Sequence, residues 1–278
     1  MKLLQNLPTL TKAMIVAGML GACQNEKEAA LSPIVEKGQN ADYQNAKLSP
    51  SYKVNRLLSE GSNVFQYTGP YRRIFRQINE ATKEYTEFNY TNANQISSIK
   101  YNSSTQEILE KSVYVLNSEG KCTQSHHKKN GASDTEVYIY EYNSDGRVKK
   151  SYKESYPKDY QVFVYGTVNG KINLQSIQYY TGPTKYKEQT FSYYYMQEDK
   201  AKINPACIAL GRGKYLPIFG NFNEHLVKDI KESSFTNQGI SSSTISREFT
   251  YSWNEQIETV TEKNNLGVLS TKRKYGVL

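Results

Sequence analysis

The chain has 278 residues, of which 24 are tyrosine and one is tryptophan, and its formal charge is +8. Long all-β domains often reach this size alone, and tyrosine is enriched in strands, so one large β domain is expected. The basic residues are spread along the chain with neither a groove-reading helix nor a base-stacking motif, which argues against a nucleic-acid partner.

Residues 1–22 have the features of a signal peptide, with Lys2 and Lys12 before a short apolar run. The run ends in small residues directly before Cys23, a pattern that resembles the bacterial lipobox. That resemblance implies that Cys23 is the lipid attachment site and that a lipid anchor joins the protein to a membrane. Several acyl chains anchor stably, at about 0.8 kcal/mol per buried methylene. An ordinary secretory signal with a chance cysteine is the alternative.

Residues 23–50 are rich in Glu, Lys, Gln and Asn and poor in large apolar groups, which predicts a flexible tether. The acidic stretch just after Cys23 is similar to export signals of surface lipoproteins. The predicted location is therefore the outer membrane, on its cell-surface or its periplasmic face. Residues 51–278 follow as a single repeat-built β domain.

The clearest copy of the repeat begins at Tyr138. Tyr138, Tyr140 and Tyr142 recur at every second position, which is the period of a strand with one ring-bearing face. Residues 143–146 then provide a tight turn that ends in glycine, and Val148 restarts the alternation on the return strand.

The same unit can be found seven times. Its paired ring positions are Phe65/Tyr67, Phe88/Tyr90, Tyr114/Leu116, Tyr140/Tyr142, Phe163/Tyr165, Tyr193/Tyr195 and Phe249/Tyr251. Its apolar return positions are Ile74, Ile96, Cys122, Val148, Ile172, Ile203 and Ile257. The pattern predicts an all-β fold, a long antiparallel β-meander of about seven hairpin repeats. A twisted sheet of that length does not stay flat, so it should be curled or partly closed around the aromatic face.

One segment departs from the pattern, at about residues 204–225. It is apolar, interrupted by Gly and Pro, and without period two. We expect it to be a loop with a short helix near 206–210 that covers the core. Burying several hundred Å² of apolar surface at about 25 cal/mol per Å² would stabilise the fold by several kcal/mol.

The form Tyr-x-Tyr-x-x-x-Gly-Arg-Val at 140–148 is similar to YD-type repeats. Residues 52–278 as a whole resemble a family of Bacteroidetes lipoproteins that is defined as a domain of unknown function. The Leu-Pro and Gly-rich stretch at 215–220 matches an insertion in the middle of that family's domain. The resemblance implies a lipidated β-meander outside the cytoplasm, and it implies no activity.

Cys122 and Cys207 could form a disulfide in an oxidising compartment, which would contribute about 2–4 kcal/mol. A metal site is not expected: Cys122 lies on an apolar return position, and the adjacent His126 and His127 would point to opposite faces of a strand. The chain also lacks a nucleophile elbow, a His-Glu-x-x-His motif and a phosphate loop, so no catalytic residue or cofactor is predicted.

Basic residues precede the return position in five units, as Arg73, Lys121, Arg147, Lys171 and Lys202. If the turns share one edge, these residues form a rim for an anionic partner, although basic residues at turn exits also keep sheet edges soluble. The sequence therefore favours a lipid-anchored, non-catalytic binding or structural module with a protein or glycan ligand. The alternative is a glycan-acting hydrolase that uses loop carboxylates, such as Glu136 and Glu141 or Glu255 and Glu258.

Overall fold

The computed structural model describes residues 55–68, 73–252 and 256–277. The predicted signal peptide and tether, including Cys23, lie outside the described residues. The strands are β1 (Asn55–Glu60), β2 (Asn63–Thr68), β3 (Arg73–Asn79), β4 (Glu84–Asn92), β5 (Gln95–Asn102), β6 (Ile108–Leu116), β7 (Cys122–Lys129), β8 (Glu136–Tyr142), β9 (Val148–Lys153), β10 (Asp159–Val168), β11 (Lys171–Thr181), β12 (Thr184–Glu198), β13 (His225–Thr236), β14 (Gly239–Ser252), β15 (Ile257–Asn264) and β16 (Gly267–Val277).

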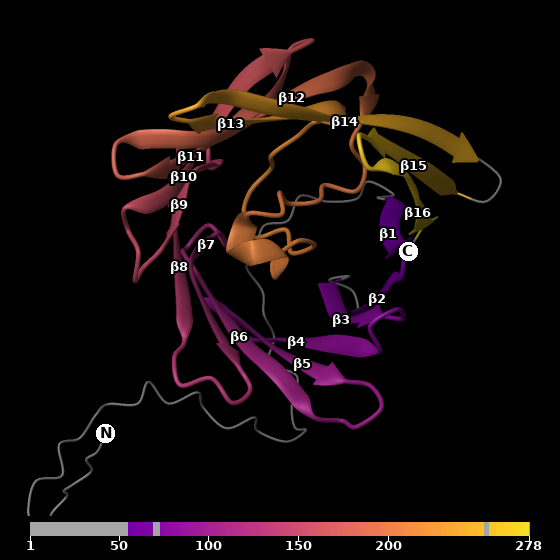
Figure 1. The fold of residues 1–278 in the computed structure, drawn as a ribbon. Helices are drawn as coiled ribbons and strands as arrows, with labels where there is room; N and C mark the ends of the chain where they lie inside the picture. Colours follow the sequence, from indigo (N-terminus) through magenta and orange to yellow (C-terminus); the bar gives the residue numbers. More distant parts are fainter. Residues whose placement is uncertain (1–54, 69–72, 253–255, 278) are drawn as a thin grey trace, which may run out of the picture. The chain divides into compact units, whose positions relative to one another are not determined.

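The sixteen strands form a closed antiparallel barrel in sequence order (Figure 1). Closure occurs between the first and last strands, where Asn55 pairs with Val277 and Leu57 with Tyr275. The sequence correctly predicted the antiparallel all-β meander, but the prediction of seven hairpins in a curled or partly closed sheet was wrong. The eighth pair, β1 with β16, is made by the first and last strands of the barrel and has no turn between them.

The alternation seen in the sequence sets the inner face of the barrel. Tyr114, Tyr140 and Phe163 are each at most 3% exposed. The intervening residues Val115 and Glu141 lie on the opposite face of their strands, as period two requires. The aromatic rows therefore form the core, as the repeat pattern predicted.

The segment between β12 and β13, residues 199–224, turns into the barrel (Figure 1, orange). We call it the plug. Its two ends meet, because Glu198 pairs with His225 and the Asp199 amide donates to the Glu224 carbonyl at 3.0 Å. The expected insertion therefore covers the core, but it begins earlier than residue 204. Its helix is a single 3-10 turn, η1 (Ile208–Gly211), because glycine ends it at once.

The plug packs its apolar residues against the inner face of the wall. Ile208, Leu216 and Phe219 are at most 2% exposed and belong to the same cluster as Tyr114 and Tyr140. The Phe219 ring meets Tyr140 edge-on, with ring centroids 5.0 Å apart. The main core is therefore formed between the plug and one side of the wall.

Two β-bulges direct backbone groups of the wall to the plug. The register shifts beside Cys122 on β7 and beside Leu174 on β11. The Cys122 amide donates to the Ile218 carbonyl at 2.8 Å, and the Leu174 amide donates to the Phe222 carbonyl at 2.9 Å. The bulges thus satisfy backbone groups of the plug, which would otherwise be buried without a partner.

Glycine is required where the plug meets the turn between β8 and β9. Gly220 has φ +81°, and a Cβ there would lie 2.6 Å from the Gly146 carbonyl oxygen. A larger residue would force the plug away from this turn, because both the backbone conformation and the space exclude it.

Three positions of the repeat were predicted wrongly. Ile203 lies in the plug and not on a return strand, because β13 starts only at His225. Ile172 is 36% exposed, because the bulge on β11 places Leu174 inward instead. Tyr195 is 67% exposed, and there β12 extends past the last regular pairing with β13.

Candidate functional site

The plug is held to one wall by a charged residue. The Arg212 guanidinium contacts Glu110 on β6 at 2.7 Å through Nε and Glu136 on β8 at 2.8 Å through Nη2. Its remaining nitrogen, Nη1, is buried and has no hydrogen-bond partner. The Arg212 carbonyl in turn accepts a hydrogen bond from the Tyr114 hydroxyl at 3.2 Å. The site therefore retains one unused donor next to two carboxylates.

A second charged contact joins the plug to β1. Lys214 and Tyr215 donate to the Glu60 carboxylate at 2.7 and 2.5 Å. Arg273 of β16 contacts Glu60 and also Glu258 of β15, each at 3.1 Å. Burial alone would raise the pKa of Glu60, but the charges of Lys214 and Arg273 outweigh burial and hold that pKa below its ordinary value.

The two contacts lie far apart around the barrel. Going round in strand order, five strands separate β1 from β7, the strand between β6 and β8. The plug therefore crosses the lumen, and Arg212 and Lys214 in its middle bind it to two separate parts of the wall through ion pairs. We call the set Glu60, Lys214, Tyr215, Glu258 and Arg273 the charged contact.

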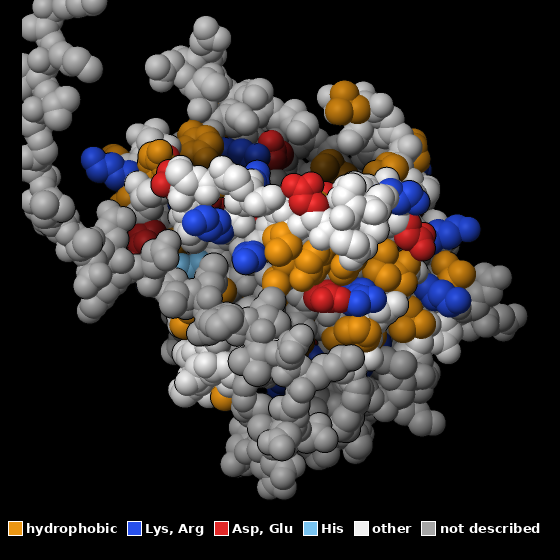
Figure 2. All heavy atoms as spheres, turned by 90° about the horizontal axis from the view of Figure 1, so that it is seen from below, with side chains coloured by type: hydrophobic (Ala, Val, Ile, Leu, Met, Phe, Trp, Pro, Cys, Tyr) orange, Lys and Arg blue, Asp and Glu red, His pale blue; other side chains and the backbone are white. Residues whose placement is uncertain are grey.

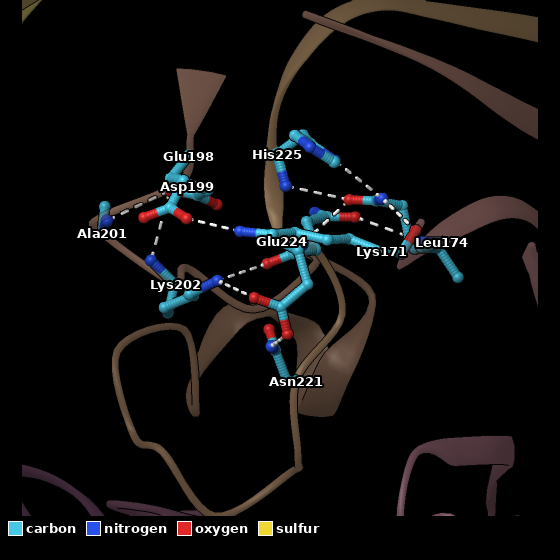
Figure 3. A network of polar contacts seen from close by, with 11 residues as sticks. Lys171, Leu174, Glu198, Asp199, Ala201, Lys202, Asn221, Glu224 and His225 are labelled. Carbon is cyan, nitrogen blue, oxygen red and sulfur yellow. Dashed lines mark hydrogen bonds and ion pairs between the residues drawn. The ribbon is translucent and has the colours of Figure 1, made fainter. Parts of the chain in front are cut away.

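A polar network closes the base of the plug (Figure 3). The Asp199 carboxylate accepts from the amides of Ala201 and Lys202 at 3.1 and 3.3 Å. The Lys202 ammonium donates to the Glu224 carboxylate at 3.0 Å, and the Asn173 side chain accepts from the amide of Glu224 at 2.9 Å. Burial raises the pKa of Asp199 above its ordinary value, although Arg273 and Lys202 act against it.

A partly open cavity of about 250 Å³ lies between the plug and strands β3 to β6. Its lining combines hydroxyl, amide and charged groups with two aromatic residues. The lining residues are Gln77, Thr86, Phe88, Ser98, Lys100, Glu110, Ser112, Tyr114, Leu210, Gly211 and Arg212. Because Arg212 is among them, the charged link between plug and wall is also part of the cavity wall.

A buried histidine beside this cavity does not form a catalytic triad. His127 Nδ1 lies 2.8 Å from the Ser112 hydroxyl and Nε2 lies 2.9 Å from the Ser125 hydroxyl. Ser125 and Glu110 lie on opposite sides of the His127 ring. Ser125 is fully buried, and its hydroxyl is hydrogen-bonded to the Tyr140 hydroxyl at 2.9 Å, so no substrate reaches it. Burial and the charge of Arg212 lower the pKa of His127 to about 3, which makes it a poor general base near neutral pH.

The carboxylates that the hydrolase alternative would use are already occupied. Glu136 binds Arg212 and Lys153 inside the barrel, and Glu141 faces the opposite side of β8 beside Lys150. Glycoside hydrolysis needs two carboxyl groups that face one substrate. Glu136 and Glu141 do not share a face, so this pair cannot act together.

The predicted basic rim residues all lie near one end of the barrel, but each has a partner within the chain. Lys121 contacts Glu119 at 2.8 Å, Arg147 contacts Asp145 at 2.7 Å, and Lys171 contacts Glu198. Lys202 contacts Glu224 at 3.0 Å. Arg73 lies over the Tyr90 ring at 5.2 Å.

A repeated cation–π contact accounts for three of these basic residues. Lys121 and Arg147 lie over the Tyr142 and Tyr165 rings, each at 5.9 Å, as Arg73 does over Tyr90. In each case the tyrosine belongs to the following hairpin. The basic position therefore connects successive repeats, and its part in binding an anionic partner stays a prediction.

Cys122 and Cys207 are free thiols in this structure, so the predicted disulfide is not present in it. Cys122 points into the core, where burial raises the pKa of its thiol. Cys207 lies in the plug, packed against the same core cluster. Within the part of the chain that the structure describes, no group of three His, Cys, Asp or Glu side chains could hold a metal ion.

The outer face of the barrel mixes apolar and charged side chains. Arg76, Glu87 and Lys111 belong to one row across neighbouring strands, and Lys263 contacts Glu248 at 2.7 Å on β15 and β14. Figure 2 shows one side of the molecule, where hydrophobic side chains gather with basic and acidic ones among them. In the ranges 55–68, 73–252 and 256–277, no helix is long and apolar enough to cross a bilayer.

Sequence reasoning missed Arg212, Glu60 and Arg273 as the residues that position the plug. A signal existed for Arg212, because it is a charged residue between two glycines in a segment that was expected to cover the core. A charge in such a place needs a buried partner. No comparable signal marked Glu60 and Arg273, because they lie in ordinary alternating strands at opposite ends of the domain.

Comparison with known proteins gives a likeness of fold. No family model and no curated protein matches the chain. A porin-like protein from Bacteroides uniformis has a similar structure, with a TM-score of 0.52 and 13% identity over 78% of this chain and 89% of that one. A porin-like protein from Bacteroides vulgatus has a TM-score of 0.50 and 12% identity over 81% of this chain and 99% of that one. The likeness extends over about four fifths of this chain and is a likeness of fold.

Proposed function

We propose that this protein is a lipid-anchored, non-catalytic barrel of the bacterial outer membrane that acts as a binding or structural module. Cys23 would carry the lipid, and the barrel would stand in water beside the membrane. The observation that carries the proposal is the plug, which crosses the lumen and is bound by ion pairs to both walls. A lumen occupied in this way is suited to binding a ligand or to a structural role, and not to the passage of solutes.

The outer face supports a barrel that is surrounded by water. Membrane-embedded barrels present an apolar band about 25 Å tall to lipid, and a Lys or Arg at the bilayer midplane costs about 2–4 kcal/mol. Lys111 and Lys128 lie directly opposite each other on the outward side of β6 and β7. Serine and threonine dominate the outward side of β14, where Ser242 contacts Ser233 of β13 at 3.0 Å.

The titratable groups beside the cavity are bonded to other side chains, an arrangement that is compatible with a non-catalytic module. His127 is bonded through both ring nitrogens, and Glu110 and Glu136 are both bound by Arg212. None of these groups has an arrangement that could activate water or a substrate.

A channel embedded in the membrane is the second candidate. It is favoured by the likeness to porin-like proteins from Bacteroides, which extends over most of both chains. In such a protein the plug would act as a gate, and the barrel would remain in the membrane without any lipid on the chain.

The variant Cys23→Ser distinguishes the two candidates. Cells grown with labelled palmitate should label the wild-type chain and a Cys207→Ser control, but not Cys23→Ser. The membrane pellet washed at alkaline pH should contain the wild type and the control, whereas Cys23→Ser should be released. Continued labelling would overturn the lipid anchor, and an unlabelled variant that stays in the washed pellet would establish a barrel embedded in the membrane.

A further inference from the structure

The cavity between the plug and strands β3 to β6 has the composition of a ligand site. At about 250 Å³ the cavity is large enough to hold several water molecules. The cavity is not an apolar void, since hydroxyl and amide groups of Gln77, Ser98 and Ser112 line it. A ligand there would replace ordered water and would have to match both donors and acceptors.

Arg212 forms one side of this cavity with its charge already balanced. Two of its guanidinium nitrogens are bonded to Glu110 and Glu136, and the third, Nη1, is buried, so a ligand in the cavity does not reach it. Because the two carboxylates fix the guanidinium plane, Arg212 presents a rigid and neutralised surface to the cavity.

The local charges argue against an anionic ligand. Lys100 is neutralised by Glu84 at 2.7 Å, and Arg212 is neutralised by two carboxylates. An added anion would gain little attraction and would face Glu110. A zwitterion would need an unpaired charge of each sign, and the charged groups named here are already paired.

A neutral polyhydroxylated ring fits these constraints. Its hydroxyls can donate to the Glu110 carboxylate and exchange hydrogen bonds with Gln77, Ser98 and Ser112, and the ring of Phe88 offers apolar surface for its C–H groups. We propose that this cavity binds a neutral saccharide unit. The inference names a ligand class for the binding module proposed above and rests on that proposal.

Saturation-transfer NMR on the purified full chain tests the proposal. The probes are neutral methyl glycosides of glucose, galactose, mannose and N-acetylglucosamine, with methyl galacturonoside as the anionic comparison and glycine as the zwitterion. We expect transfer to the ring protons of at least one neutral glycoside. The absence of transfer to all four neutral probes, or transfer to a charged probe alone, would overturn the proposal.

The variant Thr86→Phe assigns any binding to this cavity, because residue 86 lines it and phenylalanine is well accepted in strands. It should raise the Kd of the bound glycoside at least tenfold. The control Thr250→Phe makes the same change at an exposed strand position and should leave the Kd unchanged. Unaltered binding by Thr86→Phe would place the sugar elsewhere and overturn the assignment.

A folding control and a second variant show whether a loss of binding comes from the cavity or from misfolding. Circular dichroism melts establish that both variants fold, and if Thr86→Phe does not, Gln77→Leu removes a lining amide with less change in volume and should also weaken binding. Failure of the saccharide proposal leaves the membrane fractionation of Cys23→Ser unaffected, since that experiment does not involve the lumen. The two proposals can therefore fail separately.

Discussion

The plug is bound to the barrel in two chemically different ways. Toward β6 to β11 it presents Ile208, Leu216 and Phe219 to buried tyrosine and phenylalanine rings. Toward β1 it presents Lys214 and Tyr215 to the buried carboxylate of Glu60, which Arg273 of β16 also contacts. We call the first, formed by Ile208, Leu216 and Phe219, the dry contact; the second is part of the charged contact defined above.

The two contacts should contribute differently to the fold. Burial of apolar surface is non-directional, so the dry contact supplies stability but tolerates small shifts of the plug. A buried ion pair gains little net free energy and depends on geometry, so the charged contact specifies where the plug lies more than how strongly it is held. The wall at β6 to β11 thus supplies most of the stability, and the ion pairs of Arg212 fix the position of the plug there, as the charged contact does near β1.

The substitution with the largest expected effect removes the centre of the dry contact. Phe219 is fully buried and meets both Tyr114 and Tyr140 edge-on. Phe219→Ala should lower the free energy of unfolding by about 3–5 kcal/mol, because the cavity left behind cannot collapse fully. Urea denaturation followed by circular dichroism measures the loss.

The control for that variant is Leu266→Ala, at a residue that is 90% exposed. It should change the free energy of unfolding by less than about 0.5 kcal/mol. Equal effects of the two substitutions would mean that the plug does not pack as described.

The next effect concerns the charged contact. Arg273→Met should lower the free energy of unfolding by about 3 kcal/mol, because Glu60 and Glu258 would remain buried without their shared cation. The triple variant Glu60→Gln, Glu258→Gln and Arg273→Met should recover much of this loss, measured in the same denaturant series. A triple variant as unstable as the single one would show that packing, and not buried charge, sets the cost.

The effect of pH on the free energy of unfolding should differ between variants of two buried carboxyl groups, Glu60 and Asp199. The pKa of Glu60 is lowered in the folded state, so its contribution is present above the unfolded pKa of about 4.3 and is lost as pH falls through the folded value. The difference in stability between wild type and Glu60→Gln should therefore shrink on acidification. Denaturant titrations between pH 3 and 7 measure it.

Asp199 should show the opposite slope. Its pKa is raised in the folded state, so its contribution is present below the unfolded pKa of about 3.9 and is lost as pH rises through the folded value. Asp199→Asn should thus gain stability relative to wild type as pH rises from 4 to 7. Parallel curves for the two proteins would mean that this carboxyl is not buried as the structure shows.

The smallest effect on the free energy of unfolding is expected on the outer face of the barrel. The ion pair between Lys263 and Glu248 is about half exposed on both sides. Lys263→Met should change the free energy of unfolding by about 0.5 kcal/mol or less, because exposed pairs are screened by water and salt. A loss of more than 2 kcal/mol in a thermal melt would show that the outer face is packed against something in solution.

Local features of the fold could be predicted from the sequence. The alternation from Tyr138 to Tyr142 identifies the strand and its inward face, and the loss of period two in the insertion identifies a segment that covers the core. Both are local patterns of residues that share one environment. The burial of Tyr140 and Leu216 agrees with them.

Closure and the positions of the charged residues could not be predicted. The pairing of Asn55 with Val277 joins residues at opposite ends of the domain, and no local pattern records it. Ile203 was misplaced because an apolar residue at the expected spacing looks the same in a strand and in the plug. The basic residue Arg147 could be identified at its turn, but its contact with Tyr165 depends on how the next hairpin lies.

The pairing of β1 with β16 makes the order of the strands around the barrel circular, although the chain is linear. The opening between β16 and β1 then corresponds in place to the turn of an eighth hairpin. A permuted gene that joins residues 55 and 277 through a short linker, and opens the turn at Gly120, should encode the same barrel. New termini at that turn would place Tyr114 and Cys122, which share the main core, at opposite ends of the chain.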